Sequence, residues 1–244
     1  MYGYGMRYGM GYGYGLDPTI LLVLIGVLLS LWAQGRVNST FNKYSKVRSR
    51  TGMTGAEAAR RLLNSQGIYD VTVRPVSGSL TDHYDPRTKV VNLSESVYNA
   101  TSVAAIGVAA HECGHAMQHN EGYGPLKFRS ALVPVANFGS QISWPLILIG
   151  VIFGGLGSPL VQIGILMFTL AVLFQLVTLP VEFNASNRAV KLLDSQGILA
   201  GDEVKGTRKV LSAAALTYVA AAATSILQLL RLIILFGGRN RRDN

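Results

Sequence analysis

The most extended pattern along the chain is a series of long apolar stretches separated by polar segments. The first stretch runs from Ile20 to Ala33 without a charged residue, and basic residues follow from Arg36 onwards. With Asp17–Thr19 included, it reaches the roughly 20 residues that are needed to cross a bilayer. We therefore predict a transmembrane anchor over residues 18–35. A cleaved signal peptide fits less well, because no basic patch precedes the stretch and no small-residue cleavage site follows it.

Two further apolar blocks lie between Val133 and Pro180. The segment Gly154–Pro159 separates them and is rich in Gly and Pro, which interrupt both helices and strands. This pattern predicts a transmembrane helical hairpin over residues 132–181. The more polar residues 182–210 are predicted to form another helix and a loop.

The last apolar block extends from Leu211 to Phe236, with polar interruptions at Gln228 and Arg231. Its alanine-rich half offers small side chains of the kind that let membrane helices pack closely. We predict a hydrophobic helix over residues 211–237. This helix either crosses the membrane or lies partly against the polar part of the chain.

Both ends of the chain differ from the rest in composition. Met1–Gly15 consists almost entirely of Tyr and Gly, which provide too little side-chain volume for a packed core. Residues 1–17 are therefore predicted to be a disordered tail, and an adhesive or self-associating arm is the alternative. Residues 238–244 form a short basic tail.

The polar region between the anchor and the hairpin, residues 36–131, carries signals for a small mixed domain. Thr54 and Glu57 have the spacing of a capping box, and Gly67 is a typical helix stop, so a helix is predicted between them. A strand is predicted at 71–73, and a second strand at 89–93 follows a turn. The predicted fold class is a mainly α-helical, multi-pass membrane protein with a small α+β domain.

Composition and charge agree with a membrane location. Charged residues make up 14% of the chain, against about a quarter in ordinary soluble proteins. The net charge of +9 comes from scattered basic residues and not from a basic stripe interleaved with aromatic residues. We therefore predict contact with anionic lipid in a bilayer and no nucleic-acid partner.

Loop charge predicts the orientation in the membrane. Twelve Lys or Arg residues lie between Arg36 and Arg129, and none lies in the turn at 154–159. By the positive-inside rule, the polar region faces the cytoplasm. One observation disagrees: if the last apolar block crosses the membrane, the basic tail at 238–244 lies outside.

The sequence His111-Glu112-Cys113-Gly114-His115 carries the strongest signal for chemistry. Residues four apart share one face of a helix, so the two imidazoles can bind a single metal ion, typically zinc. Glu112 lies to the side, where it can take a proton from a water that zinc activates. Gly114 allows another element to approach closely. Cys113, the only cysteine, excludes an internal disulfide, and we predict that it packs in the interior.

A complete site needs a third protein ligand. His119 continues the same helical face but lies two turns beyond His111, too far to share its metal. Glu182 stands at the end of an apolar block, where an unpaired carboxylate is costly and usually functional. It is also predicted to begin a helix, so a carboxylate that stabilises a helix N-terminus is the alternative. We predict Glu182 as the third ligand of one Zn²⁺ per chain.

The chain resembles the YugP-like zinc-dependent membrane proteases of bacteria, which are relatives in general plan of membrane gluzincins such as HtpX. Three segments carry the resemblance: Leu80–Arg87, Ala109–Gln118 and Pro180–Ser186. It extends from about Leu21 to Leu235. It implies a gluzincin-like metallopeptidase domain in the bacterial inner membrane.

The resemblance also implies roles for individual residues. His111, His115 and Glu182 would be the zinc ligands, and Glu112 the catalytic base. Related gluzincins commonly have an Asp where this chain has Ser186. Orientation of a ligand histidine would therefore depend on that hydroxyl or on Asn187.

Substrate binding and oxyanion stabilisation have weaker signals. Gluzincins hold an extended peptide against an edge strand, and the predicted strand at 89–93 is the candidate. Its residues are Lys89, Val90, Val91, Asn92 and Leu93. Arg188, His119 and Tyr218 are the candidates for stabilising the oxyanion.

Together these features predict a zinc-dependent, membrane-bound endopeptidase that acts on a peptide or membrane-protein substrate. An intramembrane protease is less consistent, because polar residues follow His115 directly. The alternative from another class is a non-catalytic, metal-binding membrane scaffold or chaperone subunit. A homo-oligomer or a regulatory membrane partner is left open.

Overall fold

The computed structural model describes residues 17–237 of the chain. The predicted tails at 1–17, apart from Asp17, and at 238–244 lie outside the described residues. The described part contains seven helices and a three-stranded sheet. In chain order the elements are α1 (Ile20–Tyr44), α2 (Gly55–Ser65), β1 (Thr72–Val76), β2 (His83–Asp85), β3 (Val90–Ser94), α3 (Glu95–Tyr98), α4 (Val103–Asn120), α5 (Gly124–Gly154), α6 (Pro159–Ser195) and α7 (Asp202–Phe236).

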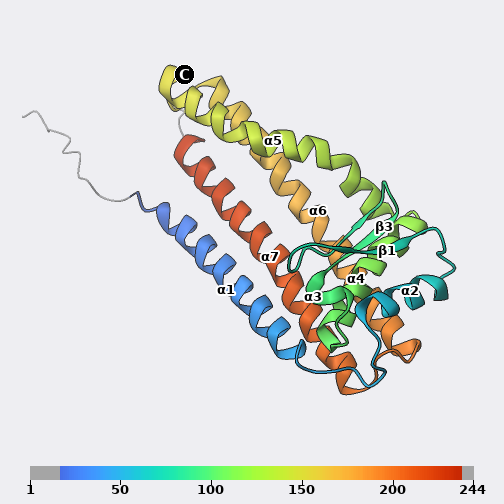
Figure 1. Cartoon of the computed structure of the whole chain (residues 1–244). Helices are drawn as coiled ribbons and strands as arrows, with labels where there is room; N and C mark the ends of the chain where they lie inside the picture. The colour runs from blue at the N-terminus through green and yellow to red at the C-terminus, as the bar shows by residue number, and fades with distance from the viewer. Residues whose placement is uncertain (1–16, 238–244) are drawn as a thin grey trace, which may run out of the picture.

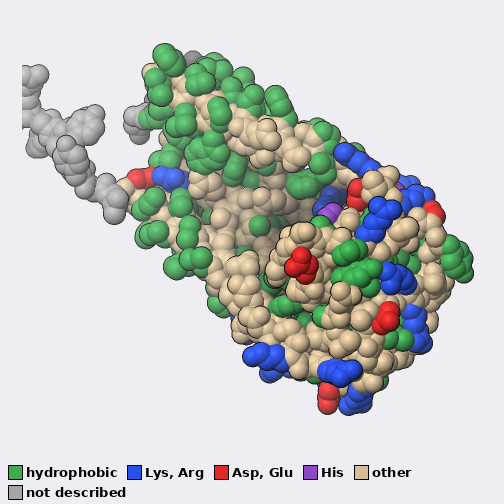
Figure 2. Space-filling model, viewed as in Figure 1, with side chains coloured by type: hydrophobic (Ala, Val, Ile, Leu, Met, Phe, Trp, Pro, Cys, Tyr) green, Lys and Arg blue, Asp and Glu red, His purple; other side chains and the backbone are tan. Residues whose placement is uncertain are grey.

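Four helices, α1, α5, α6 and α7, are long and apolar enough to cross a membrane. Figure 1 shows them as two arms, α1 beside α7 and α5 beside α6, which extend from a globular part made by the sheet and the shorter helices. Large apolar side chains are exposed on the arms, among them Leu28, Phe138 and Phe153. Figure 2 shows apolar side chains over the arms and most Lys and Arg over the globular part. The chain is thus a mainly α-helical, multi-pass membrane protein with a small α+β part.

The helices are longer than the sequence pattern predicts. α1 continues beyond the predicted anchor at 18–35 to Tyr44, and α5 begins at Gly124 instead of near residue 132. α6 runs without a break from Pro159 to Ser195 and includes Pro180. The prediction that Glu182 begins a helix is therefore wrong. Membrane helices tolerate internal proline because neighbouring groups satisfy the freed backbone positions.

The last apolar block belongs to one long helix, α7, which contacts both parts of the molecule. Its first half packs against α4 in the globular part. It also runs beside α1 over most of its length, from Gly206 at Tyr44 to Thr224 at Gly26 (Figure 1). The Thr224 hydroxyl donates to the Gly26 carbonyl at 3.0 Å and lies 3.2 Å from the Ser30 hydroxyl. These contacts join the first and the last membrane helix.

The sheet has the order β1-β3-β2, with β3 parallel to β1 and antiparallel to β2. The prediction of an edge strand at 89–93 is therefore wrong, because β3 is the central strand and has a partner on each side. A strand that is buried on both faces usually consists of a continuous run of apolar residues. In β3, Val90, Val91 and Leu93 are buried, as expected for a central strand. The edge strand beside the candidate site is β2.

Helix α4 lies at the centre of the globular part and packs against α2, α6 and α7. The close approach of α4 to α6 depends on Gly114, because an added Cβ would lie 2.6 Å from the Ala185 carbonyl oxygen of α6. The predicted close approach at this glycine is confirmed. Cys113 is fully buried, and its thiol contacts the Ala59 carbonyl, so the prediction that it packs in the interior is also confirmed.

Local signals for helix ends are confirmed at α2. The Thr54 hydroxyl accepts from the backbone N–H of Glu57, and the Glu57 carboxylate accepts from the backbone N–H of Thr54. Gly67 follows the helix with a φ of +69°, a conformation that glycine adopts without strain. This end aligns α2 with the core and leads the chain into β1.

Candidate metal centre

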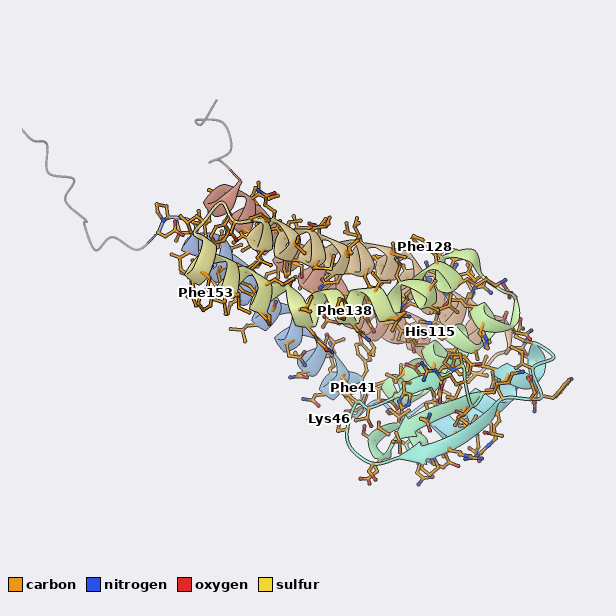
Figure 3. The ribbon with its side chains drawn as sticks, turned by 90° about the horizontal axis from the view of Figure 1, so that it is seen from above. Phe41, Lys46, His115, Phe128, Phe138 and Phe153 are labelled. Carbon is orange, nitrogen blue, oxygen red and sulfur yellow. The ribbon has the colours of Figure 1, made fainter. Side chains whose placement is uncertain are left out.

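The two motif histidines lie on one face of α4, as their spacing predicts. The helix begins after Ser102, whose hydroxyl accepts from the backbone N–H of Ala105, and continues to Asn120. The rings of His111 and His115 have centroids 4.8 Å apart and stand edge to face. Their side chains are only 15% and 13% exposed, so both are sheltered from solvent. Figure 3 shows His115 where the membrane arms meet the globular part.

Glu182 of α6 completes the group. Its Oε2 atom lies 3.3 Å from His111 Nε2 and 3.5 Å from His115 Nε2. Ligand atoms around a tetrahedral zinc ion are roughly 3.4 Å apart, given bond lengths of about 2.0–2.2 Å. This oxygen is buried and has no hydrogen-bond partner. A buried, unpaired carboxylate oxygen between two imidazole nitrogens is costly unless a cation binds there, so the three residues fit a metal ion.

A buried glutamine orients His115. Gln118 is one turn further along α4 and completely buried, and its Oε1 lies 3.0 Å from His115 Nδ1. The other end of the amide, Nε2, donates to the Val181 carbonyl and to Asn184 Oδ1. Since both amide hydrogens are used there, the oxygen must face His115. The imidazole therefore donates through Nδ1 and leaves the lone pair of Nε2 directed at the metal position.

The orientation of Asn184 is fixed in turn by Arg188. The guanidinium Nε donates to Asn184 Oδ1 at 2.7 Å, and Nη1 donates to Glu121 Oε1 at 2.6 Å. A chain of hydrogen bonds thus connects Arg188 with His115 through Asn184 and Gln118. Arg188 contributes to histidine orientation through these bonds and is not among the residues that line the cleft beside the metal position.

Ser186 orients the other histidine. Its hydroxyl lies 3.1 Å from His111 Nδ1, one turn after Glu182 on α6. This is the position at which the sequence predicted a hydroxyl in place of the Asp of related enzymes. Asn187, the other predicted residue, points elsewhere and lines a separate hollow between α6 and α7. Each ligand histidine therefore has one polar partner at Nδ1.

Comparison with known proteins agrees with this site. The family model described as "Putative neutral zinc metallopeptidase" matches residues 19–237. The chain belongs to this family. It is also 54% identical over 224 residues to the "Putative membrane protease YugP" of Bacillus subtilis (strain 168), which covers 92% of this chain and 98% of that protein. No solved structure matches the chain. The resemblance stated from the sequence is thereby confirmed, as is a zinc-peptidase class of function.

An open cleft of about 1120 Å³, lined by both polar and apolar residues, surrounds the three candidate ligands. Glu112 lines it and is 8% exposed. Two of the predicted oxyanion candidates, His119 and Tyr218, also line the cleft. His119 does not belong to the metal-binding group, and its Nδ1 is 2.9 Å from the hydroxyl of Tyr84. The structure therefore brings Glu112 and Tyr218 to the metal position and places His119 further along the cleft.

One charged residue of the site was missed by the sequence analysis. Arg129, near the start of α5, places Nη1 3.4 Å from Glu182 Oε1. This ion pair holds the second carboxylate oxygen and leaves Oε2 facing the histidines. No local signal identifies Arg129, because its partner lies 53 positions later on another helix. Gln118 could have been found, because it lies on the same helical face as His115, three residues on.

Electrostatics of the globular part support this assignment. Burial lowers the pKa of His115, but its contact with Glu182 and the charges of Glu112 and Glu182 outweigh this effect and raise the pKa above its usual value. The site therefore attracts positive charge, whether a proton or a metal ion. Burial raises the pKa of Tyr84 to about 12, so its phenol stays protonated beside His119. Burial also raises the pKa of Cys113, which argues against a thiolate nucleophile.

Proposed function

We propose that the chain is a zinc-dependent, membrane-bound endopeptidase that binds one Zn²⁺ through His111, His115 and Glu182. The observation that carries this proposal is the buried Glu182 Oε2, which has no hydrogen-bond partner and lies between two imidazole nitrogens. The hydrogen bonds at each Nδ1 direct both Nε2 lone pairs to the same point. Two histidines and one carboxylate are the ligand set of catalytic zinc sites that keep one position open.

When bound there, zinc would lower the pKa of a coordinated water to about 7 and polarise the scissile carbonyl. Glu112 follows His111 directly and lines the same cleft, so it is placed to accept the proton of the attacking water. It would then donate that proton to the leaving amine. Tyr218 lines the cleft from α7 and is the candidate that donates a hydrogen bond to the oxyanion.

Strand β2 is the proposed site of main-chain pairing with the substrate. His83 and Tyr84 of this strand line the cleft, and within residues 17–237 β2 pairs only with β3. Its other edge can therefore add an extended peptide. This assignment replaces the strand at 89–93 as the candidate substrate-binding strand.

The position of the site along α6 supports cleavage near the membrane surface. Glu182 lies 23 residues beyond Pro159, the first residue of the helix after the hairpin turn. At a rise of about 1.5 Å per residue this is roughly 34 Å, slightly more than the apolar thickness of a bilayer, about 30 Å. We propose a bacterial cell membrane location with the cleft at the cytoplasmic surface, where the basic residues of the globular part would lie.

The test combines metal content with proteolysis. Wild type, Glu112→Gln and the control Glu95→Gln, at an exposed position of α3, are purified in detergent. We expect about one zinc per chain in all three, and cleavage of a labelled unfolded protein by wild type and the control only. Zinc without cleavage in wild type would instead support the non-catalytic scaffold. Absence of zinc in wild type would contradict the metal assignment.

A further inference from the structure

A second, smaller cavity lies directly beside the metal-binding group. Its volume is about 170 Å³, and it shares His111, Glu112, Glu182 and Tyr218 with the large cleft. The two cavities therefore meet at the candidate catalytic residues. Apart from the residues of the centre itself, most of its wall is apolar. The apolar residues are Val37, Leu80, Val108, Leu211, Ala214 and Ala215.

The wall of this cavity is built from separate parts of the chain. Val37 comes from the second half of α1, Val108 from α4, and Leu211 and Ala214 from α7. The small side chain of Ala214 leaves room that a larger residue at this position would fill. An apolar cavity of roughly 150 Å³ is large enough to hold a benzene molecule. This one therefore has room for a side chain of the size of leucine or phenylalanine.

Leu80 is held at the cavity by strained backbone. Its φ is +57°, a left-handed conformation that is costly for a residue with a branched apolar side chain. The loop is anchored by Asp82, which accepts from the Ser94 backbone N–H at 2.7 Å and from the Ser94 hydroxyl at 3.0 Å. Leu80 is the first residue of the segment Leu80–Arg87, which carries part of the family resemblance. Its side chain lines the mostly apolar cavity beside the metal position.

We propose that this cavity binds a large apolar side chain of the substrate next to the scissile bond. The inference rests on the proposed peptidase function. A peptide that passes the metal position must place side chains on both sides of the scissile bond. On one side the cleft includes the cationic residues Arg87, Lys127 and Arg129. On the other side the wall is mostly apolar, and Asp82 is its one charged residue outside the metal-binding group and Glu112. The enzyme is thus selective for leucine, methionine or phenylalanine at one position and tolerant of polar residues across the bond.

The test separates binding from cleavage. The peptides carry Gly, Leu or Phe at one position beside the scissile bond and are otherwise identical. Fluorescence anisotropy measures their affinity for the full-length, zinc-loaded Glu112→Gln protein. The same peptides are cleaved by the protein with Glu112 intact. We expect Leu and Phe to exceed Gly by at least about tenfold in both affinity and kcat/KM.

Two substitutions, each made with and without Glu112→Gln, change the cavity in opposite ways. Ala214→Leu fills it, and we expect the Leu-to-Gly ratio to fall at least about tenfold. Leu80→Gly removes part of the wall and the strained side chain, and we expect a shift of preference towards Phe. The matched control is Ala221→Leu at an exposed position two turns further along α7, which should keep the wild-type ratio.

The outcomes distinguish the two proposals. Two results would overturn the cavity assignment and leave the peptidase function intact. One is equal cleavage rates for the Gly, Leu and Phe peptides, and the other is a Leu-to-Gly ratio in Ala214→Leu that equals the wild-type ratio. A binding preference that is lost in Ala214→Leu, without any cleavage by wild type, would support the cavity as a binding site and contradict the peptidase function. Zinc content of each variant shows that the fold is retained.

Discussion

At the scale of single residues, the orientation of each proposed ligand depends on one further polar group. Ser186 holds His111, Gln118 holds His115, and Arg129 holds the Oε1 atom of Glu182. Outer groups of this kind fix the histidine tautomer and commonly change metal affinity by about 10–100-fold. The arrangement of the proposed metal site therefore depends on six side chains and not only on its three candidate ligands.

Replacement of Gln118 by Leu tests this dependence. The shape is nearly kept, but the partner of His115 Nδ1 is lost, so the imidazole can rotate or adopt the other tautomer. We expect zinc affinity to fall by roughly 10–100-fold, measured by competition with a fluorescent chelator. Gln66→Leu, at an exposed position after α2, is the control and should leave the affinity unchanged. Equal affinity in the two variants would show that Gln118 does not orient the ligand.

At the scale of elements, the site depends on the close packing of α4 against α6. Two of the proposed ligands come from α4 and the third from α6, so the separation of these helices decides whether all three can reach one ion. Gly114 permits this separation, because even a methyl group would press on the Ala185 backbone.

Gly114→Ala is expected to destabilise the protein by about 1–3 kcal/mol and to weaken zinc binding. Thermal unfolding with and without chelator measures the first effect, and zinc content after dialysis measures the second. Gly35→Ala in α1 is the matched control, since no atom lies within 4 Å of the added Cβ. It should be neutral or slightly stabilising, because alanine favours helix by about 1 kcal/mol. Equal behaviour of the two variants would argue against a packing role for Gly114.

The capping box of α2 makes a pH-dependent contribution to stability. Hydrogen bonds from the backbone and hydroxyl of Thr54 lower the pKa of Glu57. A carboxylate with a lowered folded-state pKa stabilises the fold above its unfolded pKa of about 4.3, and this contribution is lost as the pH falls through the folded value. We expect wild type to be more stable than Glu57→Ala at pH 7, with a difference that shrinks below about pH 4.3. Denaturant unfolding across this range measures it, and a constant difference would contradict the ionic origin.

At the scale of the whole molecule, the metal would connect the globular part to the membrane hairpin. His111 and His115 belong to the globular helix α4, whereas Glu182 lies on the hairpin helix α6. A ligand that binds only the folded state stabilises it, by about 2.7 kcal/mol at a free concentration of 100 times Kd.

Chelation should therefore lower the unfolding temperature of the whole protein. We expect a clear downward shift with EDTA in wild type, which added zinc restores. The shift should disappear in His111→Ala but persist in His119→Ala, because His119 lies outside the metal-binding group. A shift of equal size in both variants would place the metal elsewhere in the chain.

The sequence alone determined the features that depend on neighbours along the chain. The apolar stretches indicated the membrane helices, because length and hydropathy are local properties. The capping box of α2 follows from a fixed spacing, and so does the histidine pair. Glu182 stood out because a carboxylate is unusual at the end of an apolar block. The family resemblance implied the same three ligands.

Only the tertiary structure decided what depends on residues far apart in the sequence. It showed that β3 is central and β2 is the edge, that Pro180 lies within one continuous helix, and that Arg129 pairs with Glu182. It also joined α1, α4, α7 and the loop of Leu80 into one apolar cavity beside the metal position. Packing between distant segments sets the strand order, the orientation of a buried amide and the walls of a cavity. These features therefore cannot be inferred from the spacing of residues along the chain.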